Sequence, residues 1–292
     1  MITQKSFDPK NKFGTLYLVP TPIGNLADMT FRAVSVMKQA DLIAAEDTRN
    51  TQKLLNHFEI ETKQISFHEH NTVQRIPELI NRLKDGLTIA QVSDAGMPSI
   101  SDPGHELVTA CIKAQIPVVP LPGANAGLTA LIASGISPQP FYFYGFLPRK
   151  PKDQRHELTE LVDRPETLIF YEAPHRLLKT LKMLQAVLGD SRMASLCREL
   201  TKKHEEFIRG SLEQLIAWAD GTTIRGEFVI IVSGNQHPVQ TDQDELIANL
   251  SLSQQVDRFI EGGLPVNEAI KKVAKSHHLR KQIVYNEYHQ IK

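Results

Sequence analysis

The residues best suited to chemistry in this 292-residue chain lie in one polar loop, residues 93–104. The loop follows an apolar segment, Leu87–Val92, that is typical of a buried β-strand. Open α/β sheets bind ligands where such strands end, so the loop predicts a site for a polar ligand. A tight turn that only caps the next helix is the alternative. The side chains that offer acceptor or donor oxygens are Asp94, Ser99, Ser101 and Asp102.

The same order, a strand-like segment and then a loop of proline, glycine and small residues, occurs elsewhere in the chain. Helix-like patterns over 76–83, 106–114 and 177–188 separate these segments. This alternation predicts a mostly parallel sheet covered by helices, with the loops gathered at one edge. Recurrence therefore favours a composite ligand site over isolated turns. The other pairs of strand and loop are 16–19 with 20–25, 117–121 with 122–127, and 167–171 with 172–176.

Composition indicates a globular protein with no overall bias toward nucleic acid. The 33 basic and 33 acidic residues balance, which still allows a local basic patch. The content of 41% hydrophobic residues is enough for substantial cores. No apolar segment approaches the roughly 20 residues that span a bilayer, and residues 1–12 are polar, so we expect neither a membrane span nor a secretory signal. Cys111 and Cys197 are isolated, which favours buried thiols in the cytoplasm.

Several common catalytic motifs are absent from the sequence. It contains no Gly-x-Gly-x-x-Gly turn, no Gly-x-x-x-x-Gly-Lys-Ser/Thr loop, no Gly-x-Ser-x-Gly elbow, no His-Glu-x-x-His and no Cys-x-x-Cys pair. Dehydrogenases, P-loop NTPases, α/β-hydrolases and zinc enzymes therefore lose support. The loops suit a ligand with amino, carboxylate, ribose and adenine groups but without a pyrophosphate.

The predicted elements divide the chain into two α/β domains and a helical extension. We expect a flexible leader at 1–13, a first α/β domain at 14–124 and a second at 125–235, with a ligand cleft between the domains. Residues 236–292 are expected to form a linker and a small helical extension. These helices either pack against the core or contact nucleic acid as a helix-turn-helix does, and the sequence leaves both open. Their helix-like segments are 246–250, 256–260, 266–274 and 279–288.

Short motifs follow one another along the chain in a specific order. They are Leu18–Leu26, Ala45–Arg49, Ser66–Asn71, Ser93–Pro98, Leu121–Ala124, Gly145–Lys150 and Tyr171–Arg176. In this order they closely resemble the ribosomal RNA small-subunit methyltransferase I family, within the tetrapyrrole methylase superfamily of class III methyltransferases. The resemblance covers about residues 14–234, and the helical tail is also similar to the family's C-terminal extension. It implies two α/β domains of the tetrapyrrole methylase type with a cleft between them.

The resemblance also implies an activity. A methyl group would pass from S-adenosylmethionine to the 2′-hydroxyl of a cytidine in the decoding region of 16S ribosomal RNA, in the small ribosomal subunit. The reaction would need alignment of oxygen, methyl and sulfur and a proton acceptor, but no metal, because the sulfonium makes the methyl group electrophilic. A cytoplasmic homodimer is expected. The alternatives are a tetrapyrrole methylase of the same fold, which needs a large apolar pocket, and a non-catalytic ribosome-assembly factor.

By this resemblance, turns and walls of the cleft hold the methyl donor. The alternative for each residue of this set is a purely structural role, in shaping a turn or filling a core. The aromatic segment Phe141–Phe146 fits a base-stacking platform, but alternating burial in a strand fits better, since only half of the rings face one side. The expected cofactor-binding residues are Pro20, Asp94, Gly96, Ser99, Gly123, Ala124, Tyr144, Phe146, Tyr171, Ala173 and Gly226.

The resemblance assigns candidate catalytic and RNA-binding roles to charged residues. Glu46 or Asp47 would orient the ribose or receive its proton, and Arg49 would bind a phosphate. Taken alone, this segment fits a solvated helix N-terminus better, and its place in the series of motifs reverses that preference. A cationic rim around the cleft would attract RNA. The expected RNA-binding residues are Arg49, Arg149, Lys150, Arg176, Lys202 and Lys203.

Overall fold

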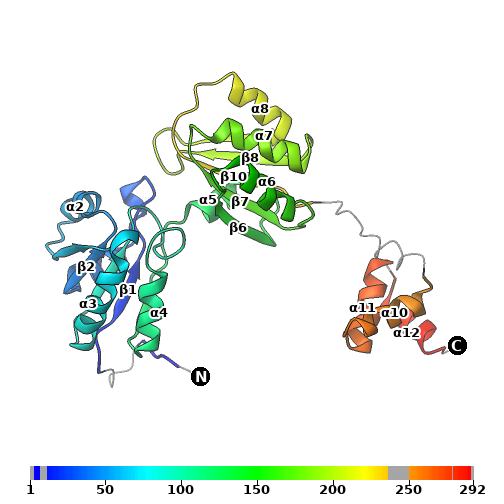
Figure 1. The fold of residues 1–292 in the computed structure, drawn as a ribbon, viewed down its shortest axis with the longest axis horizontal. Coiled ribbons are helices and arrows are strands. Elements are labelled where there is room, and N and C mark those ends of the chain that lie inside the picture. The colour runs from blue at the N-terminus through cyan, green and yellow to red at the C-terminus, as the bar shows by residue number, and fades with distance from the viewer. Residues whose placement is uncertain (1–2, 7–11, 236–249, 278, 291–292) are drawn as a thin grey trace. The chain divides into compact units, whose positions relative to one another are not determined.

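A computed structural model describes residues 3–6, 12–235, 250–277 and 279–290 of the chain. It separates into two compact units, Met1–Asn235 and Gln236–Lys292 (Figure 1). The first unit contains two five-stranded sheets, each covered by helices. Within the described residues, no helix has the length and apolar character needed to cross a membrane.

The first sheet is entirely parallel, with the strand order β3-β2-β4-β1-β5. Every residue of β2 and β4 is buried, because helices cover both faces of the sheet. All of its strands end at one edge, so the loops that follow them meet there. The strands are β1 (Leu16–Val19), β2 (Leu42–Ala45), β3 (Gln64–Ser66), β4 (Ile89–Val92) and β5 (Val118–Pro120).

Two layers of helices enclose this sheet. Met37 of α1 and Leu55 of α2 lie in the core on one face, and Leu79 of α3 and Leu107 of α4 lie in the core on the other. Burying each such side chain contributes about 1.5–3 kcal/mol. The helices are α1 (Phe31–Gln39), α2 (Thr48–His57), α3 (Thr72–Lys84) and α4 (His105–Lys113), with the 3₁₀ helices η1 (Leu26–Asp28) and η2 (Glu69–Asn71).

The second sheet is mixed, with the strand order β6-β7-β10-β8-β9. Only the β6–β7 pair is parallel, so the expectation of mostly parallel pairing holds for the first sheet alone. Strand β9 carries polar residues and was not expected from the sequence. It pairs antiparallel with β8 along its whole length. The strands are β6 (Phe141–Phe146), β7 (Thr167–Glu172), β8 (Met193–Arg198), β9 (Glu206–Ser211) and β10 (Phe228–Val232).

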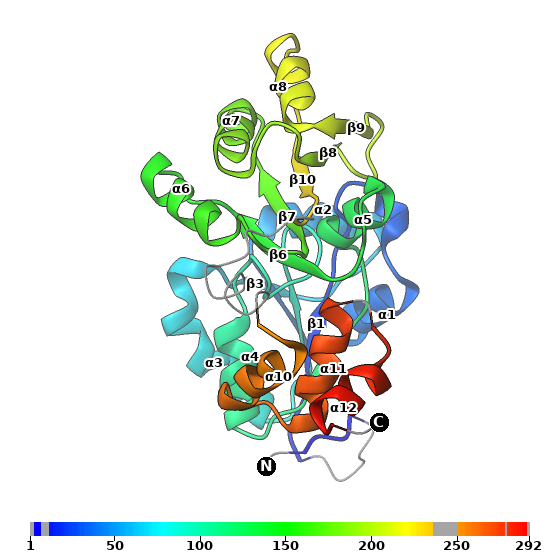
Figure 2. The same cartoon turned by 90° about the vertical axis from the view of Figure 1, so that its right-hand side faces the viewer.

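Helices α6, α7 and α8 cover one face of the second sheet, and α5 covers the other (Figure 2). Helix α8 begins at a capping box in which Ser211 and Gln214 satisfy each other's backbone amides. Ala130 and Leu131 of α5 pack against the strands. The helices are α5 (Ala126–Ser134), α6 (Pro151–Glu160), α7 (Leu177–Leu188) and α8 (Leu212–Asp220).

The predicted boundaries at 13, 124 and 235 stay predictions, as do the roles given to the segments between them. The boundary at 124 falls between β5 and α5. In the leader, the Gln4 amide both donates to Val118 O and accepts from Val118 N, each at 2.9 Å, which satisfies part of the edge of β5. Residues 1–2 and 7–11 of the leader, the predicted linker, and residues 246–249 of the first predicted tail helix lie outside the described residues.

Candidate functional site

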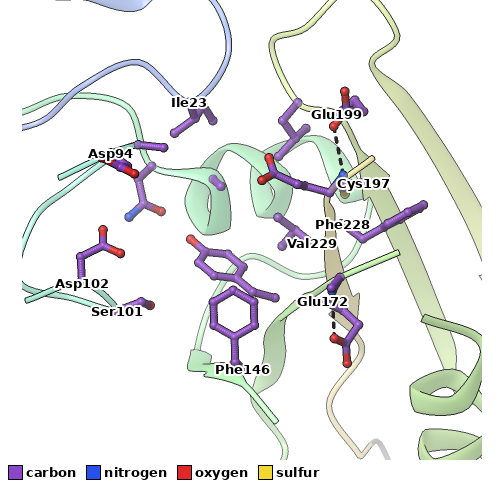
Figure 3. A pocket seen from close by; sticks show the side chains of 18 of the residues that line it. Ile23, Asp94, Ser101, Asp102, Phe146, Glu172, Cys197, Glu199, Phe228 and Val229 are labelled. Atoms are coloured by element: carbon purple, nitrogen blue, oxygen red, sulfur yellow. Dashed lines mark hydrogen bonds between the residues drawn. The ribbon is translucent and has the colours of Figure 1, made fainter. Parts of the chain in front are cut away.

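Residues from both sheets of the first unit line one cavity of about 620 Å³. Asp94, Ser101 and Asp102 face it from the first sheet's edge, and Val229 faces it from the second sheet (Figure 3). This volume is typical of sites for small molecules and cofactors. Of the residues predicted to act, Glu46, Asp94, Gly96, Phe146, Tyr171, Ala173 and Lys202 line this cavity.

The loops after β1 and β4 form one continuous surface beside the cavity. Thr21 and Gly96 exchange two backbone hydrogen bonds of 3.0 Å. The Thr21 hydroxyl donates to Ser93 O at 3.1 Å, and the Ser93 hydroxyl donates to Gly96 O at 3.2 Å. Gly96 has a φ of 79°, a conformation that favours glycine. The polar residues of the predicted loop therefore fix its backbone as well as facing the cavity.

A reciprocal pair of hydrogen bonds joins the loops after β2 and β4. The Glu46 carboxylate accepts from Asp94 N at 3.2 Å, and the Asp94 carboxylate accepts from Asp47 N at 3.2 Å. The second oxygen of Asp94 accepts from the Asn50 side chain at 3.0 Å. Hydrogen bonds to charged acceptors are the stronger kind. Asp94 therefore holds two loops in place while it also lines the cavity.

Neighbouring carboxyls at this edge differ in acidity. Burial is the largest influence on Glu46 and Asp102, and it raises the pKa of each carboxyl above its ordinary value. Asp47 has the opposite shift, because the Arg49 side chain donates to its two oxygens at 3.0 and 2.7 Å and lowers its pKa to about 2. Glu46 is therefore the stronger base of the two predicted proton acceptors.

An irregularity in β6 decides which aromatic rings face the cavity. The register with β7 shifts between Phe143 and Gly145, so Phe146 lies 5.5 Å from the ring of Tyr171, centroid to centroid. Strict alternation would have placed Phe146 on the face of Tyr144. Tyr144 packs instead into the core on the other face, 5.7 Å from the ring of Phe170. The cavity wall therefore contains Phe146 but not Tyr144.

Tyr171 joins this wall to the start of α5. Its hydroxyl accepts from Gly127 N at 3.0 Å, and Asn125 caps the same helix by accepting from Leu128 N. Burial raises the pKa of the Tyr171 hydroxyl, so it stays protonated at neutral pH. Tyr171 is thus an uncharged, fixed part of the cavity wall.

Several predicted cofactor-binding residues support the cavity without lining it. A methyl group on Gly123 would come within 2.4 Å of Pro20 Cβ, so these two loops need glycine to approach so closely. A methyl group on Gly226 would meet Glu199 at 2.5 Å. The Ser99 hydroxyl lies 3.3 Å from the amide of Gln91 and accepts from it, instead of facing the cavity. Ala124 lies in the same loop as Gly123, and its carbonyl oxygen would contact a methyl group on Gly96.

Two of the predicted RNA-binding cations are committed to contacts within the protein. The Arg176 guanidinium donates to Leu147 O and Pro148 O at 2.9 and 3.2 Å and lies 3.3 Å from the buried carboxylate of Glu172. The Lys202 ammonium donates to two glutamates, each at 2.9 Å. Arg176 therefore clamps the loop after β6, and Lys202 neutralises carboxylates at the cavity. The glutamates bound to Lys202 are Glu199 and Glu227.

Other predicted cations are exposed. Arg149, Lys150 and Lys203 lie on the surface, and no ion pair of theirs occurs among the described residues. Arg49 is also exposed, with 86% of its side chain accessible, although it is paired with Asp47. These side chains are the ones free to reach a large anionic ligand.

Sequence reasoning missed most of the wall that the second sheet supplies. Cys197 and Val229 belong to strands that were expected to be core, and Glu199, Glu227 and His175 had no assigned role at the cavity. Burial raises the pKa of Cys197 to about 11, so it is a thiol and not a nucleophile. In the sequence, the one signal that these residues lie at the cavity is that they are near the ends of predicted strands. Within the described part of the chain, no cluster of His, Cys, Asp and Glu could hold a metal ion.

Comparison with known proteins identifies similar sequences along the whole chain. The family described as Tetrapyrrole (Corrin/Porphyrin) Methylases matches residues 15–216. A protein of Streptococcus pyogenes serotype M3 is 53% identical over 292 residues, 100% of both chains, and is named Ribosomal RNA small subunit methyltransferase I. Proteins with the same name from Halalkalibacterium halodurans and Bacillus subtilis are 53% and 52% identical and cover 99% and 98% of this chain and 100% and 98% of their own.

Solved structures share the fold of the first unit. Uroporphyrin-III-C-methyltransferase from Thermus thermophilus has a TM-score of 0.53 at 20% identity, covering 75% of this chain and 94% of its own. A cobalt precorrin-4 methyltransferase has a TM-score of 0.57 at 15% identity with the same coverage. The Thermus enzyme complexed with S-adenyl homocysteine has a TM-score of 0.55 at 17% identity and covers 75% and 97%. The predicted α/β fold of this type is confirmed.

Proposed function

Because this chain belongs to the tetrapyrrole methylase family, and within it to the ribosomal RNA small subunit methyltransferase I group, we propose that it methylates the 2′-hydroxyl of a cytidine in the decoding region of 16S ribosomal RNA. The family consists of S-adenosylmethionine-dependent methyltransferases. The observation that carries the proposal is the single cavity on which loops from both sheets converge. Identity of 52–53% to relatives of that name supports the choice of substrate.

The residues of the cavity fit the methyl donor. S-adenosylmethionine carries positive charge on its sulfonium and amino groups, and Glu46, Asp94 and Asp102 place carboxyls at one side of the cavity. Its adenine needs an apolar surface, which Phe146 and Val229 offer on the other side. The polar loops and the apolar wall thus match the two ends of this ligand.

We assign proton acceptance to Glu46. When bound, S-adenosylmethionine supplies an electrophilic methyl group, which the ribose oxygen attacks in line as the carbon–sulfur bond breaks and the hydroxyl proton leaves. Glu46 lines the cavity, and its raised pKa makes it a better acceptor than Asp47, whose pKa is about 2. Arg49 then keeps Asp47 ionised, and its exposed guanidinium is available to an RNA phosphate.

The exposed cations give the proposed RNA surface. Arg149 and Lys150 lie three and four residues after the end of β6, and Lys203 follows Lys202 of the cavity wall. Neither Arg176 nor Lys202 belongs to this surface in our proposal, because protein groups already occupy their donors. Arg149, Lys150 and Lys203, with Arg49, would attract the RNA backbone toward the methyl donor.

A transfer assay tests the proposal directly. Purified protein is incubated with tritiated S-adenosylmethionine and, separately, with undermethylated small ribosomal subunits, naked 16S ribosomal RNA or uroporphyrinogen. We expect label in ribosomal RNA, and nuclease digestion followed by mass spectrometry should locate it on the 2′-oxygen of one cytidine. Label on a base or on another nucleotide would refute the proposed position while leaving the ribosomal RNA substrate intact.

The same assay separates the alternatives. Label in uroporphyrinogen alone would make the chain a tetrapyrrole methylase and would overturn the proposal. Absence of label in all three substrates, with retained binding to small subunits, would indicate an assembly factor that does not catalyse transfer. The carboxylates at the cavity disfavour the tetrapyrrole alternative, since a macrocycle that carries many carboxylates itself would be repelled by them.

We also propose a homodimer that acts in the cytoplasm, where an enzyme of ribosomal RNA meets its substrate. Phe31 and Ile132 are 97% and 80% exposed, which makes them available to an apolar interface. Sedimentation equilibrium of the full chain tests this, with Phe31→Asp as the variant expected to weaken association. A monomeric wild-type protein at micromolar concentration would refute the dimer.

A further inference from the structure

The second unit has a core of its own. Helices α10 (Leu252–Glu261), α11 (Val266–Ser276) and α12 (Lys281–Tyr288) each contact the other two, and they lie together in Figure 2. Their core includes Val256 of α10, Ile270 of α11 and Val284 of α12, which are completely buried. These helices therefore hold each other, and their outward-facing side chains are not needed for this core.

A buried polar contact joins the end of α11 to α10. The Gln255 side chain is 2% exposed and donates to Leu250 O at 2.9 Å. Its Oε1 lies 2.8 Å from Nε2 of His277, the residue that ends α11. A buried amide with both ends bonded restricts the groups that it joins. His277, at the end of α11, is thus held against α10.

Positive charge gathers at the turn between α11 and α12. Residues 271–281 contain five Lys or Arg residues and no Asp or Glu. The acidic residues of the described unit lie outside that range, at 257, 261, 268 and 287. The cations are Lys271, Lys272, Lys275, Arg280 and Lys281.

Three acidic side chains of this unit contact Arg258, Lys271 and Tyr288. Glu261 pairs with Arg258 at 3.1 Å, and Glu268 lies 3.8 Å from Lys271. Asp257 accepts from the Tyr288 hydroxyl at 2.8 Å. Lys272 also has no ion pair among the described residues, but its ammonium lies 4.2 Å from the centroid of the Phe259 ring. The other three cations are exposed and have no ion pair among the described residues, and we call them the basic turn. They are Lys275, Arg280 and Lys281.

Hydrogen-bonding and apolar groups flank the basic turn. Gln282 and Asn286 are joined along α12 by a 2.7 Å hydrogen bond. Leu279 and Ile283 are 37% and 48% exposed. Amides beside unpaired cations suit a ligand that is both anionic and rich in hydrogen-bonding groups, as a nucleic acid backbone with its bases is.

We propose that the basic turn binds the phosphate backbone of ribosomal RNA and so forms a second RNA contact, separate from the cations around the cavity. The inference rests on the proposed function, which makes ribosomal RNA the substrate. Each cation that neutralises a phosphate releases counterions, so the contact should depend strongly on salt. An acidic protein of the small subunit is the competing partner, and the experiment distinguishes it.

The test removes the basic turn from the full-length protein. The variant Lys275→Ala/Arg280→Ala/Lys281→Ala is compared with the wild type in binding to naked 16S ribosomal RNA at several salt concentrations. We expect affinity to fall about tenfold at 0.15 M salt, and the slope of log affinity against log salt to decrease by about two to three. The affinity for S-adenosylhomocysteine, measured by calorimetry, should stay the same.

A matched control removes three exposed lysines elsewhere. Lys38, Lys84 and Lys113 lie in the last turns of α1, α3 and α4, which lead back to the edge of the first sheet opposite the cavity. Replacing all three by alanine removes the same charge, and we expect little loss of RNA affinity. A charge-conserving variant, Lys275→Arg/Arg280→Lys/Lys281→Arg, should bind RNA as the wild type does, which would show that the contact depends on positive charge at these positions.

Equal loss in the control, or unchanged affinity and salt dependence in the alanine variant, would overturn the inference. Weaker binding to assembled small subunits, with unchanged binding to naked RNA, would instead assign the basic turn to a ribosomal protein and overturn it as well. In each of these cases the proposed methyl transfer to ribosomal RNA would still stand. The proposed methyl transfer would fail only if the wild-type protein transferred no methyl group to ribosomal RNA.

Discussion

The two sheets of the first unit meet the cavity in different ways. The parallel sheet contributes loop residues, among them Glu46, Asp94 and Asp102. The mixed sheet contributes residues within its strands, such as Phe146 and Val229. The loops after the parallel strands meet at one edge, whereas the second sheet presents side chains to the cavity from the face that α5 also covers. The first sheet therefore supplies the acidic loops to which we assign the chemistry, and the second supplies the apolar wall beside the paired charges of Glu199, Lys202 and Glu227.

The largest expected effect tests the chemical side. We expect Glu46→Gln to lower kcat by about 100-fold to 10,000-fold, because the amide cannot accept a proton but keeps an oxygen for Asp94 N. The affinity for S-adenosylhomocysteine should fall much less than kcat, since the loop is retained and Asp94 and Asp102 keep their carboxyls at the cavity. Wild-type kcat should fall as pH decreases through the raised pKa of Glu46, where the carboxyl becomes protonated. The transfer rate to ribosomal RNA, measured at several pH values for the wild type and for Glu46→Gln, tests the loss of activity and the pH dependence.

Asp47→Asn is the control, because a carboxyl with a pKa of about 2 is a weak base. It should keep most of the transfer rate and the acid limb of the pH profile. If Asp47→Asn lost more activity than Glu46→Gln, the assignment of the two carboxyls would have to be exchanged.

The next effect concerns the stability of the second sheet, where Arg176 pairs with Glu172. Arg176→Ala leaves Glu172, whose side chain is 1% exposed, without its cation, so we expect the free energy of unfolding to fall by about 3 kcal/mol. Urea denaturation measures it. Arg149→Ala is the matched variant, since Arg149 is exposed, and it should weaken RNA binding about threefold with no loss of stability. Equal stability of both variants would contradict the clamp role of Arg176.

Cofactor affinity tests whether the polar loops hold the methyl donor. Asp94→Asn removes the negative charge of a carboxylate at the cavity wall. This carboxylate also accepts hydrogen bonds from Asp47 N and from the Asn50 side chain. We expect the affinity for S-adenosylmethionine to fall about 10-fold to 100-fold, as measured by calorimetry, because hydrogen bonds to charged groups contribute about 1.5–3 kcal/mol. Asp28→Asn, in the exposed η1, should have no effect. Unchanged affinity in Asp94→Asn would remove this residue from the binding site.

The smallest expected effect concerns the apolar wall. Phe146→Ala should weaken S-adenosylmethionine binding about tenfold through lost ring contact. It should cost little stability, because Phe146 is 57% exposed. Phe141→Ala serves as control, since Phe141 lies at the start of the same strand with 42% exposure and does not line the cavity. Similar affinities for the two variants would mean that the second sheet does not contribute the shape of the site.

The sequence by itself determined where strands end in loops and which family the chain belongs to. Apolar segments followed by proline and glycine identified the loops after β1, β4, β5 and β7, because backbone conformation depends on nearby residues. The ordered motifs carried the family resemblance, which the relatives confirm. Local signals of this kind need no knowledge of the packed chain.

Only the tertiary structure decided what each side chain faces. Because of the register shift in β6, Phe146 faces the cavity and Tyr144 faces the core. The Arg176 guanidinium contacts Glu172 and two backbone carbonyls instead of solvent. Burial raised the pKa of Glu46, whereas hydrogen bonds from Arg49 lowered the pKa of Asp47. Such contacts join residues from different elements, and their partners depend on pairing and packing that no short segment contains.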